Sequence, residues 1–200
     1  MTQRVDVSPH GERRDALDQR WSGFLGACGF VPVAAPNDPG RALDIVAVVE
    51  PAGLLLTGGN DLACVGGDAP ERDRTEAALI DWAIRTKRPI LGICRGMQVL
   101  LARFGCDLVR VEQHVAVRHA IETVAGQSEV NSYHGFAVLD LQPPLEVLAH
   151  SPDGVIEGFR HPDYPIVGLM WHPERETPIR AADVRLVRDV FGGRVSRLAL

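Results

Sequence analysis

The chain has 200 residues, of which 46% are hydrophobic and 24% are charged. This composition is typical of a globular protein with a buried core, and it excludes a disordered chain. The formal net charge of −5 provides no basic surface, so nucleic acid is not expected as a partner. No apolar run is long enough to cross a bilayer, and the first residues lack the apolar segment of a secretory signal. We therefore expect one cytoplasmic domain over residues 1–200 that has no membrane partner.

The cysteines and most histidines show no spacing typical of a disulfide framework or a metal site. None of the four cysteines forms a CxxC pair: Cys28, Cys64, Cys94 and Cys106. Five histidines are expected at the surface or in hydrogen bonds: His10, His114, His119, His150 and His161. We therefore expect neither a metal nor a cofactor.

The hydrophobic pattern predicts short apolar strands that alternate with helices. The first half is predicted as a helix over residues 16–27, strands over 30–35 and 53–57, and a helix over 76–84. A strand over 89–93 and a helix over 97–104 follow, then extended pieces over 109–138, a strand over 166–170 and a closing helix over 181–191. Apolar strands separated by helices indicate a mostly parallel sheet that is covered on both faces. We expect a single-domain α/β fold in the form of a three-layer sandwich.

In such sheets, ligands bind beyond the carboxyl ends of the strands. Three polar or glycine-rich segments directly follow predicted strands, at residues 58–61, 94–98 and 171–174. These segments are therefore the first candidates for a functional site.

The sequence Gly92-Ile93-Cys94-Arg95-Gly96 joins an apolar strand to a helix. A nucleophile on a tight strand-to-helix turn needs small neighbours, because the backbone there is crowded. A helix N-terminus also favours a thiolate over a thiol. Cys94 is thus a candidate nucleophile, and the alternative is a buried structural cysteine.

A cysteine nucleophile requires a base and a group that orients the base. His172 follows the last predicted strand, and Glu174 lies two residues further on. Pro173 disfavours a helix at His172, and alternate residues of an extended chain point to the same side. Together with Cys94 these residues make a candidate Cys–His–Glu triad, whereas His-Pro-Glu alone is equally compatible with a polar loop.

Acyl transfer also needs hydrogen-bond donors for the oxyanion that develops. Gly58-Gly59 follows a strand and can turn its amide groups outward, although the segment alone is more typical of a simple tight turn. The backbone amide of Arg95 would be the second donor, as in other nucleophile elbows.

Four sequence blocks together resemble the class I glutamine amidotransferase-like superfamily. In chain order they are LLLTGGND at residues 54–61, GICRGMQ at 92–98, VNSYHG at 130–135 and GLMWHPE at 168–174. The forms TGGND and VNSxH are most similar to the γ-glutamyl hydrolase-like cysteine peptidase branch. The resemblance implies a flavodoxin-like class I amidotransferase fold.

The resemblance also implies a role for each residue of the candidate site. Cys94 would attack a γ-glutamyl carbonyl to form a thioester, His172 would transfer protons, and Glu174 would orient His172. The amides of Gly59 and Arg95 would hold the oxyanion. Six further residues match the substrate-binding segments of the family: Gly58, Asn60, Gln98, Ser132, Tyr133 and His134.

The start of the chain has a narrower likeness. TQRV at residues 2–5 and RDALDQRW at residues 14–21 resemble γ-glutamyl-CDP-amidate hydrolases of capsule phosphoramidate biosynthesis. If Arg4 ends the first strand, it lies at the sheet edge of the active site, where an arginine suits a phosphate. The alternative is a solvated surface arginine. Few residues precede Arg4, so the first strand is expected to be short.

We therefore expect a hydrolase of γ-glutamyl amide or phosphoramidate bonds that releases L-glutamate from a small-molecule substrate. One alternative is a glutaminase subunit that delivers ammonia to a separate synthase. The other is a non-catalytic relative that serves as a binding or regulatory module. A homodimer is left open.

Overall fold

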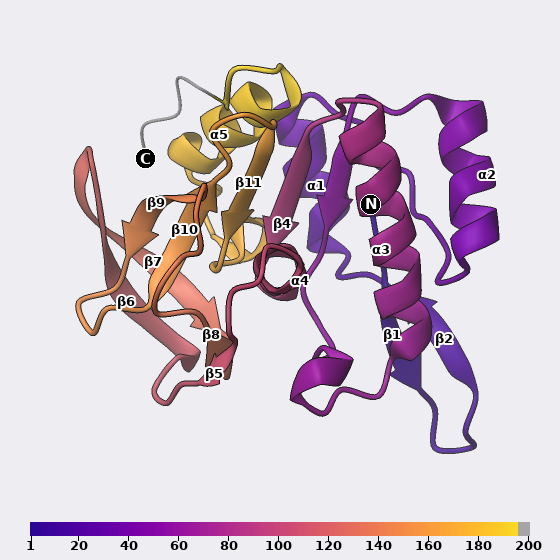
Figure 1. The fold of residues 1–200 in the computed structure, drawn as a ribbon, viewed down its shortest axis with the longest axis horizontal. Helices are drawn as coiled ribbons and strands as arrows, with labels where there is room; N and C mark the ends of the chain where they lie inside the picture. The colour runs from indigo at the N-terminus through magenta and orange to yellow at the C-terminus, as the bar shows by residue number, and fades with distance from the viewer. Residues whose placement is uncertain (196–200) are drawn as a thin grey trace.

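The computed structural model describes residues 1–195, and its elements alternate between helices and strands along the first half of the chain (Figure 1). The helices are α1 (Arg20–Cys28), α2 (Pro39–Val49), α3 (Pro70–Arg85), α4 (Arg95–Arg103) and α5 (Ala181–Phe191), with the 3-10 turns η1 (Ala63–Val65) and η2 (Pro173–Arg175). The strands are β1 (Arg4–Val7), β2 (Arg13–Ala16), β3 (Leu54–Leu56), β4 (Ile90–Ile93), β5 (Val109–Arg110), β6 (Val115–Thr123), β7 (Gly126–Tyr133), β8 (Phe136–Ala137), β9 (Glu146–His150), β10 (Ile156–Arg160) and β11 (Ile166–Leu169). No helix in this part of the chain is long and apolar enough to cross a membrane.

The main sheet has the strand order β3-β4-β11-β10-β9-β6-β7. Only β3, β4 and β11 run parallel to one another, and every other neighbouring pair is antiparallel. The expectation of a mostly parallel sheet is therefore wrong. Parallel neighbours need a long crossover, usually a helix, whereas the strands from β6 to β11 follow one another through short connections that allow only antiparallel pairing.

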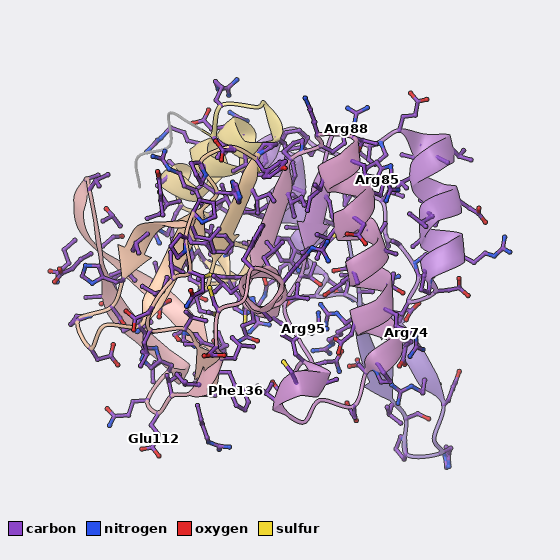
Figure 2. The ribbon with its side chains drawn as sticks, viewed as in Figure 1. Arg74, Arg85, Arg88, Arg95, Glu112 and Phe136 are labelled. Carbon is purple, nitrogen blue, oxygen red and sulfur yellow. The ribbon has the colours of Figure 1, made fainter. Side chains whose placement is uncertain are left out.

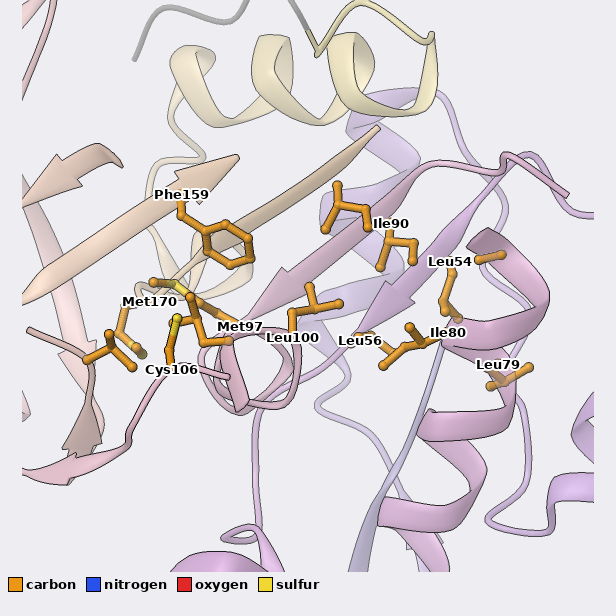
Figure 3. Packing of buried hydrophobic residues seen from close by; sticks show 14 of the residues in the cluster. Leu54, Leu56, Leu79, Ile80, Ile90, Met97, Leu100, Cys106, Phe159 and Met170 are labelled. Carbon is orange, nitrogen blue, oxygen red and sulfur yellow. The ribbon is translucent and has the colours of Figure 1, made fainter. Parts of the chain in front are cut away.

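Helices cover both faces of the parallel part of the sheet, as expected for a three-layer α/β fold. Alternate residues along each strand point to opposite sides, so Leu55 packs with α1 and α5, while Leu54 and Leu56 pack with α3 and α4. Figure 3 shows the second of these clusters, where Met97 and Leu100 of α4 lie against the sheet. The carboxyl ends of the parallel strands β3, β4 and β11 lie together at one edge of the sheet.

Several predicted elements differ in the structure. Residues 13–16 form β2, which pairs with β1 in a separate hairpin, so α1 begins only at Arg20. Arg4 begins β1 and does not end a first strand. Residues 30–35 are not a strand, although Val33 and Ala35 exchange backbone hydrogen bonds with Met1. The prediction also missed α2, β9 and β10.

Candidate active site

Cys94 lies in the sharp turn between β4 and α4 with a φ of 52°, in the left-handed region that non-glycine residues rarely adopt. Its backbone N–H donates a hydrogen bond to the carbonyl of Leu169 on β11, at 2.8 Å. The two glycines of the motif allow the close packing that this turn needs. A Cβ on Gly96 would lie 2.2 Å from the carbonyl oxygen of Leu56, and one on Gly92 would lie 2.4 Å from that of Gly96.

His172 and Glu174 follow β11, next to the turn that carries Cys94. Nδ1 of His172 lies 2.7 Å from Oε1 of Glu174, and both side chains are buried. The other side of the imidazole faces Cys94, because a Cβ added to Gly58 would lie 3.4 Å from Nε2 of His172 and 3.5 Å from Cβ of Cys94. The predicted Cys94, His172 and Glu174 are thus brought together in the order of a nucleophile, a base and an orienting carboxylate.

The charge state of His172 follows from this surrounding. Burial lowers the pKa of His172, but the Cys94 thiolate and the Glu174 carboxylate outweigh burial and raise the pKa to about 9. The raised pKa keeps the imidazole of His172 protonated at neutral pH, beside the side chain of Cys94.

The loop after β3 forms one wall of this site. A Cβ on Gly58 would lie 2.6 Å from Cε1 of His172 and 3.5 Å from Cβ of Cys94, so only glycine leaves room for the pair. Gly59 has a φ of 87°, and Arg4 lies against it, because a Cβ on Gly59 would be 2.9 Å from Cδ of Arg4. Arg4 therefore lies beside this loop, although it begins β1 and does not end a first strand.

A buried arginine that the sequence analysis missed holds this loop from behind. Arg72 of α3 is fully buried and donates hydrogen bonds to the carbonyl oxygens of Thr57 (2.6 Å), Gly58 (3.1 Å) and Gly59. Its Nε also donates to Oε1 of Glu76 at 2.9 Å. Because the carbonyls point toward α3, the conformation of the loop is determined by a side chain from another layer.

The side chain of Arg95 belongs to the same network and not to the substrate pocket. It is buried between α4 and α3, as Figure 2 shows, and its guanidinium donates to Glu76 and Asp73. Burial opposes the charge of Glu76, but the guanidiniums of Arg72 and Arg95 hold its pKa below the ordinary value. The backbone amide of Arg95, at the first position of α4, has no acceptor within its own helix.

Asn131 of β7 holds the backbone of His172. It belongs to the block VNSYHG, but no role was predicted for it from the sequence. Its Nδ2 donates to the carbonyl of His172 at 2.8 Å, and its Oδ1 accepts from the His172 N–H at 3.0 Å. Nδ2 also donates to Oε1 of Glu176 at 2.7 Å, and Glu176 in turn pairs with Arg118. Only strand pairing brings these distant residues together, so their spacing carried no signal.

The remaining predicted residues have defined partners. Asn60 bonds to both backbone groups of Val5, and Gln98 donates to the carbonyl of Phe136 at 2.8 Å, so both side chains hold backbone of the protein. Ser132 is buried and donates to the carbonyl of residue 114 at 2.6 Å. The ring of Tyr133 packs edge-on against His172, with 5.8 Å between the centroids. His134 is buried away from the thiol, next to Glu157.

A thiol at a helix N-terminus, a buried imidazole and a carboxylate behind it define the geometry of a cysteine-nucleophile site on an α/β sheet. A family model described as glutamine amidotransferase class-I matches residues 34–189. The chain belongs to the class I glutamine amidotransferase family.

Curated relatives and solved structures agree with this family. The chain is 32% identical to the γ-glutamyl-CDP-amidate hydrolase of Campylobacter jejuni over 140 residues, which cover 69% of this chain and 68% of the relative. It is 27% identical to the γ-glutamyl-γ-aminobutyrate hydrolase PuuD of Escherichia coli, over 82% of this chain and 80% of the relative. A glutamine amidotransferase structure from Thermotoga maritima has a TM-score of 0.63 at 19% identity, and covers 94% of this chain and 81% of its own. This last likeness shows the fold.

Proposed function

We propose that this chain is a hydrolase that cleaves γ-glutamyl amide or phosphoramidate bonds and releases L-glutamate. The observation that carries the proposal is the placement of Cys94 beside His172, both against Gly58, with Nδ1 of His172 2.7 Å from Oε1 of Glu174. The relatives support the bond that is cleaved, because two of them are named as hydrolases of γ-glutamyl compounds.

The first half of the reaction uses the thiolate–imidazolium pair. The thiolate of Cys94 attacks the γ-carbonyl carbon of the glutamyl group, and the carbonyl oxygen becomes an oxyanion. The backbone amides of Gly59 and Arg95 stabilise this oxyanion. His172 then gives its proton to the leaving nitrogen, the C–N bond breaks, and a γ-glutamyl thioester on Cys94 remains.

The second half regenerates the enzyme. The neutral imidazole of His172 accepts a proton from a water molecule that attacks the thioester carbonyl. The carbon–sulfur bond breaks, L-glutamate leaves and the Cys94 thiolate is restored. Glu174 keeps Nδ1 of the imidazole protonated, so that the other nitrogen faces the reacting atoms in both halves.

We further propose that the leaving group carries a phosphate, as in a γ-glutamyl cytidine phosphoramidate. Two arginines, Arg4 and Arg175, line one hollow beside His172 and Gly59, so two guanidiniums are available to a departing group there. The carboxylates of Asp18 and Glu174 also line this hollow and lie 3.8 Å and 3.6 Å from Nε of Arg175. Arginine binds phosphate with two parallel hydrogen bonds, which an uncharged amine cannot accept. Such a substrate would place the enzyme in the formation of a phosphoramidate-modified capsule.

The test is glutamate release by the purified full chain. The panel comprises glutamine, γ-glutamyl-γ-aminobutyrate, a γ-glutamyl peptide and γ-glutamyl-CDP-amidate. We expect the cytidine conjugate to be cleaved with the highest kcat/KM, no turnover by Cys94→Ala, and full turnover by the matched variant Cys64→Ala, because Cys64 is exposed and lies outside the site.

The other outcomes separate the alternatives. Preferred cleavage of γ-glutamyl-γ-aminobutyrate, whose leaving group carries a carboxylate and no phosphate, would overturn the phosphoramidate substrate and keep the hydrolase. Preferred turnover of glutamine would favour a glutaminase subunit. Equal release by wild type and Cys94→Ala, or no release from any substrate, would overturn the proposed hydrolase.

A further inference from the structure

Three histidines surround one buried glutamate away from the thiol. His114 lies in the loop before β6, His119 is in β6, His134 directly follows β7, and Glu157 is in β10. The sheet curls here, because β6 pairs with β9 only near one end, so the other end of β6 approaches β10. The backbone N–H of His134 donates to the carbonyl of His114 at 3.1 Å, which places these two side chains together.

The nitrogens of all three rings converge on one oxygen atom. Oε1 of Glu157 lies 3.2 Å from Nε2 of His134, 3.5 Å from Nδ1 of His114 and 3.5 Å from Nε2 of His119. In a tetrahedral site with metal–ligand bonds of about 2.0–2.1 Å, neighbouring donor atoms lie about 3.3 Å apart. The donor atoms of His114, His134 and Glu157 all lie within 4.8 Å of one another, so small side-chain shifts produce this geometry.

Hydrogen bonds among the described residues do not satisfy this cluster. His114, His134 and Glu157 are buried, with relative exposures of 2%, 2% and 0%. Nδ1 of His114, Nε2 of His119 and Oε2 of Glu157 nevertheless have no hydrogen-bond partner in the described part of the chain. Buried polar atoms are nearly always paired in folded proteins, so several unpaired atoms that share one small space point to a bound ligand.

A second carboxylate determines which nitrogen of His114 faces the cluster. Nε2 of His114 lies 2.9 Å from Oδ2 of Asp153, and Asp153 also accepts a hydrogen bond from Ser151. When Nε2 carries the proton that bonds to Asp153, Nδ1 presents a lone pair toward Glu157. Metal-binding histidines are oriented in this way by a carboxylate on the far side of the ring.

We propose that His114, His134 and Glu157 bind one divalent transition-metal ion, with His119 as the neighbouring fourth donor. Imidazole with carboxylate suits Zn²⁺, Co²⁺ or Ni²⁺, whereas Mg²⁺ and Ca²⁺ prefer oxygen ligands alone. The ion would join the loop before β6, the end of β7 and β10. It would thereby hold Tyr133, which precedes His134 and packs against the ring of His172.

No metal was expected from the sequence, because these residues lie far apart in the chain and show none of the usual ligand spacings. The proposed site does not depend on the proposed hydrolase. Its residues are distinct from the Cys94–His172–Glu174 group, and its test measures the bound ion and not turnover.

The test uses the full chain, stripped of metal with a chelator and then titrated with Zn²⁺ alone. We expect one Zn²⁺ per chain by elemental analysis and a higher midpoint of thermal unfolding, with no effect of Mg²⁺. Glu157→Gln should weaken Zn²⁺ binding by about 100-fold, and Asp153→Asn by about 10-fold, because the latter removes only the outer carboxylate. The matched variant His10→Gln, at an exposed turn, should bind as wild type does.

Cys94 and His172 are the competing ligands for Zn²⁺, so Cys94→Ala is part of the test. We expect Cys94→Ala to keep the ion, and we expect Co²⁺ bound to wild type to lack a thiolate charge-transfer band. These two measurements decide the question even where Glu157→Gln fails to fold. Loss of the ion in Cys94→Ala, a thiolate band, or no bound metal at all would overturn the proposal; the last result would leave a cluster of histidines around one glutamate.

Discussion

Asn131 and His172 are joined side chain to backbone by two hydrogen bonds, one in each direction. Nδ2 of Asn131 donates to the carbonyl of His172 at 2.8 Å, and the N–H of His172 donates to Oδ1 of Asn131 at 3.0 Å. The side-chain amide of Asn131 makes the two hydrogen bonds that a neighbouring strand would make, because it pairs with both backbone groups of one residue. The position of the candidate base His172 therefore depends on a residue of β7, the strand at the edge of the main sheet opposite β3.

Asn131→Ala should lower both stability and turnover. It leaves two buried backbone groups of His172 without partners, which costs about 2–4 kcal/mol in the free energy of unfolding. Release of the His172 backbone should lower kcat/KM roughly 10- to 100-fold through misplacement of the imidazole. Urea unfolding and steady-state kinetics check this, with Gln127→Ala on the exposed part of β7 as the control. Equal effects of the two variants would contradict the role of Asn131.

Glu174→Gln should move the basic limb of the kcat/KM profile toward neutral pH. Burial lowers the pKa of His172, and Cys94 and Glu174 raise it to about 9. A raised pKa means that the imidazolium, which protonates the leaving group, persists up to that pH and is lost above it. Glu174→Gln removes one of the groups that raise the pKa of His172, while the lowering effect of burial remains. The imidazolium should therefore be lost at a lower pH than in the wild type.

The measurement for Glu174→Gln is kcat/KM between pH 6 and 10 with the preferred γ-glutamyl substrate. The apparent pKa belongs to the thiolate–imidazolium pair and should be read as such. Glu112→Gln is the matched control, because Glu112 is an exposed carboxylate, labelled in Figure 2, far along the chain from the pair. An unshifted basic limb in Glu174→Gln would exclude an electrostatic contact with His172.

Iodoacetamide should report the thiolate of Cys94 without any substrate. Cys64 is exposed and serves as an internal reference, while burial raises the pKa of Cys28 to about 11 and keeps it a thiol. His172→Gln removes the positive charge beside Cys94, so alkylation of Cys94 should slow by about 10-fold or more at pH 7 while Cys64 is unaffected. Peptide mass spectrometry gives both rates in one sample. An unchanged ratio of the two rates would exclude the ion pair.

Arg72→Lys should weaken catalysis through the loop that holds Gly59. A lysine keeps the charge, but its single ammonium cannot reach the three carbonyls of Thr57, Gly58 and Gly59 that the guanidinium contacts. We expect a loss of about 2 kcal/mol in the free energy of unfolding and roughly a 10-fold fall in kcat with little change in KM. Arg74→Lys on the exposed side of α3 is the matched control. A change confined to KM would contradict an effect on the oxyanion loop.

Two glycine-to-alanine variants should change stability in opposite directions. Gly96→Ala places a Cβ 2.2 Å from the carbonyl of Leu56, so α4 must move away from β3, at a cost of about 3 kcal/mol or more. Gly26→Ala on α1 adds a methyl group to open space and should stabilise by about 0.5–1 kcal/mol through helix propensity. Thermal unfolding compares the two. A neutral Gly96→Ala would contradict the tight packing of the turn.

Local patterns predicted the parts of the fold that depend on neighbours in the chain. The apolar runs that became β3, β4 and β11 are buried on both faces, so their hydrophobicity alone identified them. The helix 181–191 was confirmed at its predicted bounds, because its apolar residues recur with helical period. The predicted helix 16–27 begins too early, because residue 16 ends β2, whose charged residues show no alternation of the kind that a strand pattern requires.

Within the site, the sequence alone was enough to find the residues that strand ends bring together. Cys94 and His172 follow adjacent parallel strands, so the rule that ligands bind at this sheet edge was enough to pair them. Arg72, Asn131 and the group around Glu157 could not be found in this way. Their contacts run between layers of the fold or across antiparallel strands, where the partners of a side chain depend on register and curl and not on spacing. Such contacts form only in the folded chain, because burial of a charged or amide group becomes favourable only after its partners are in place.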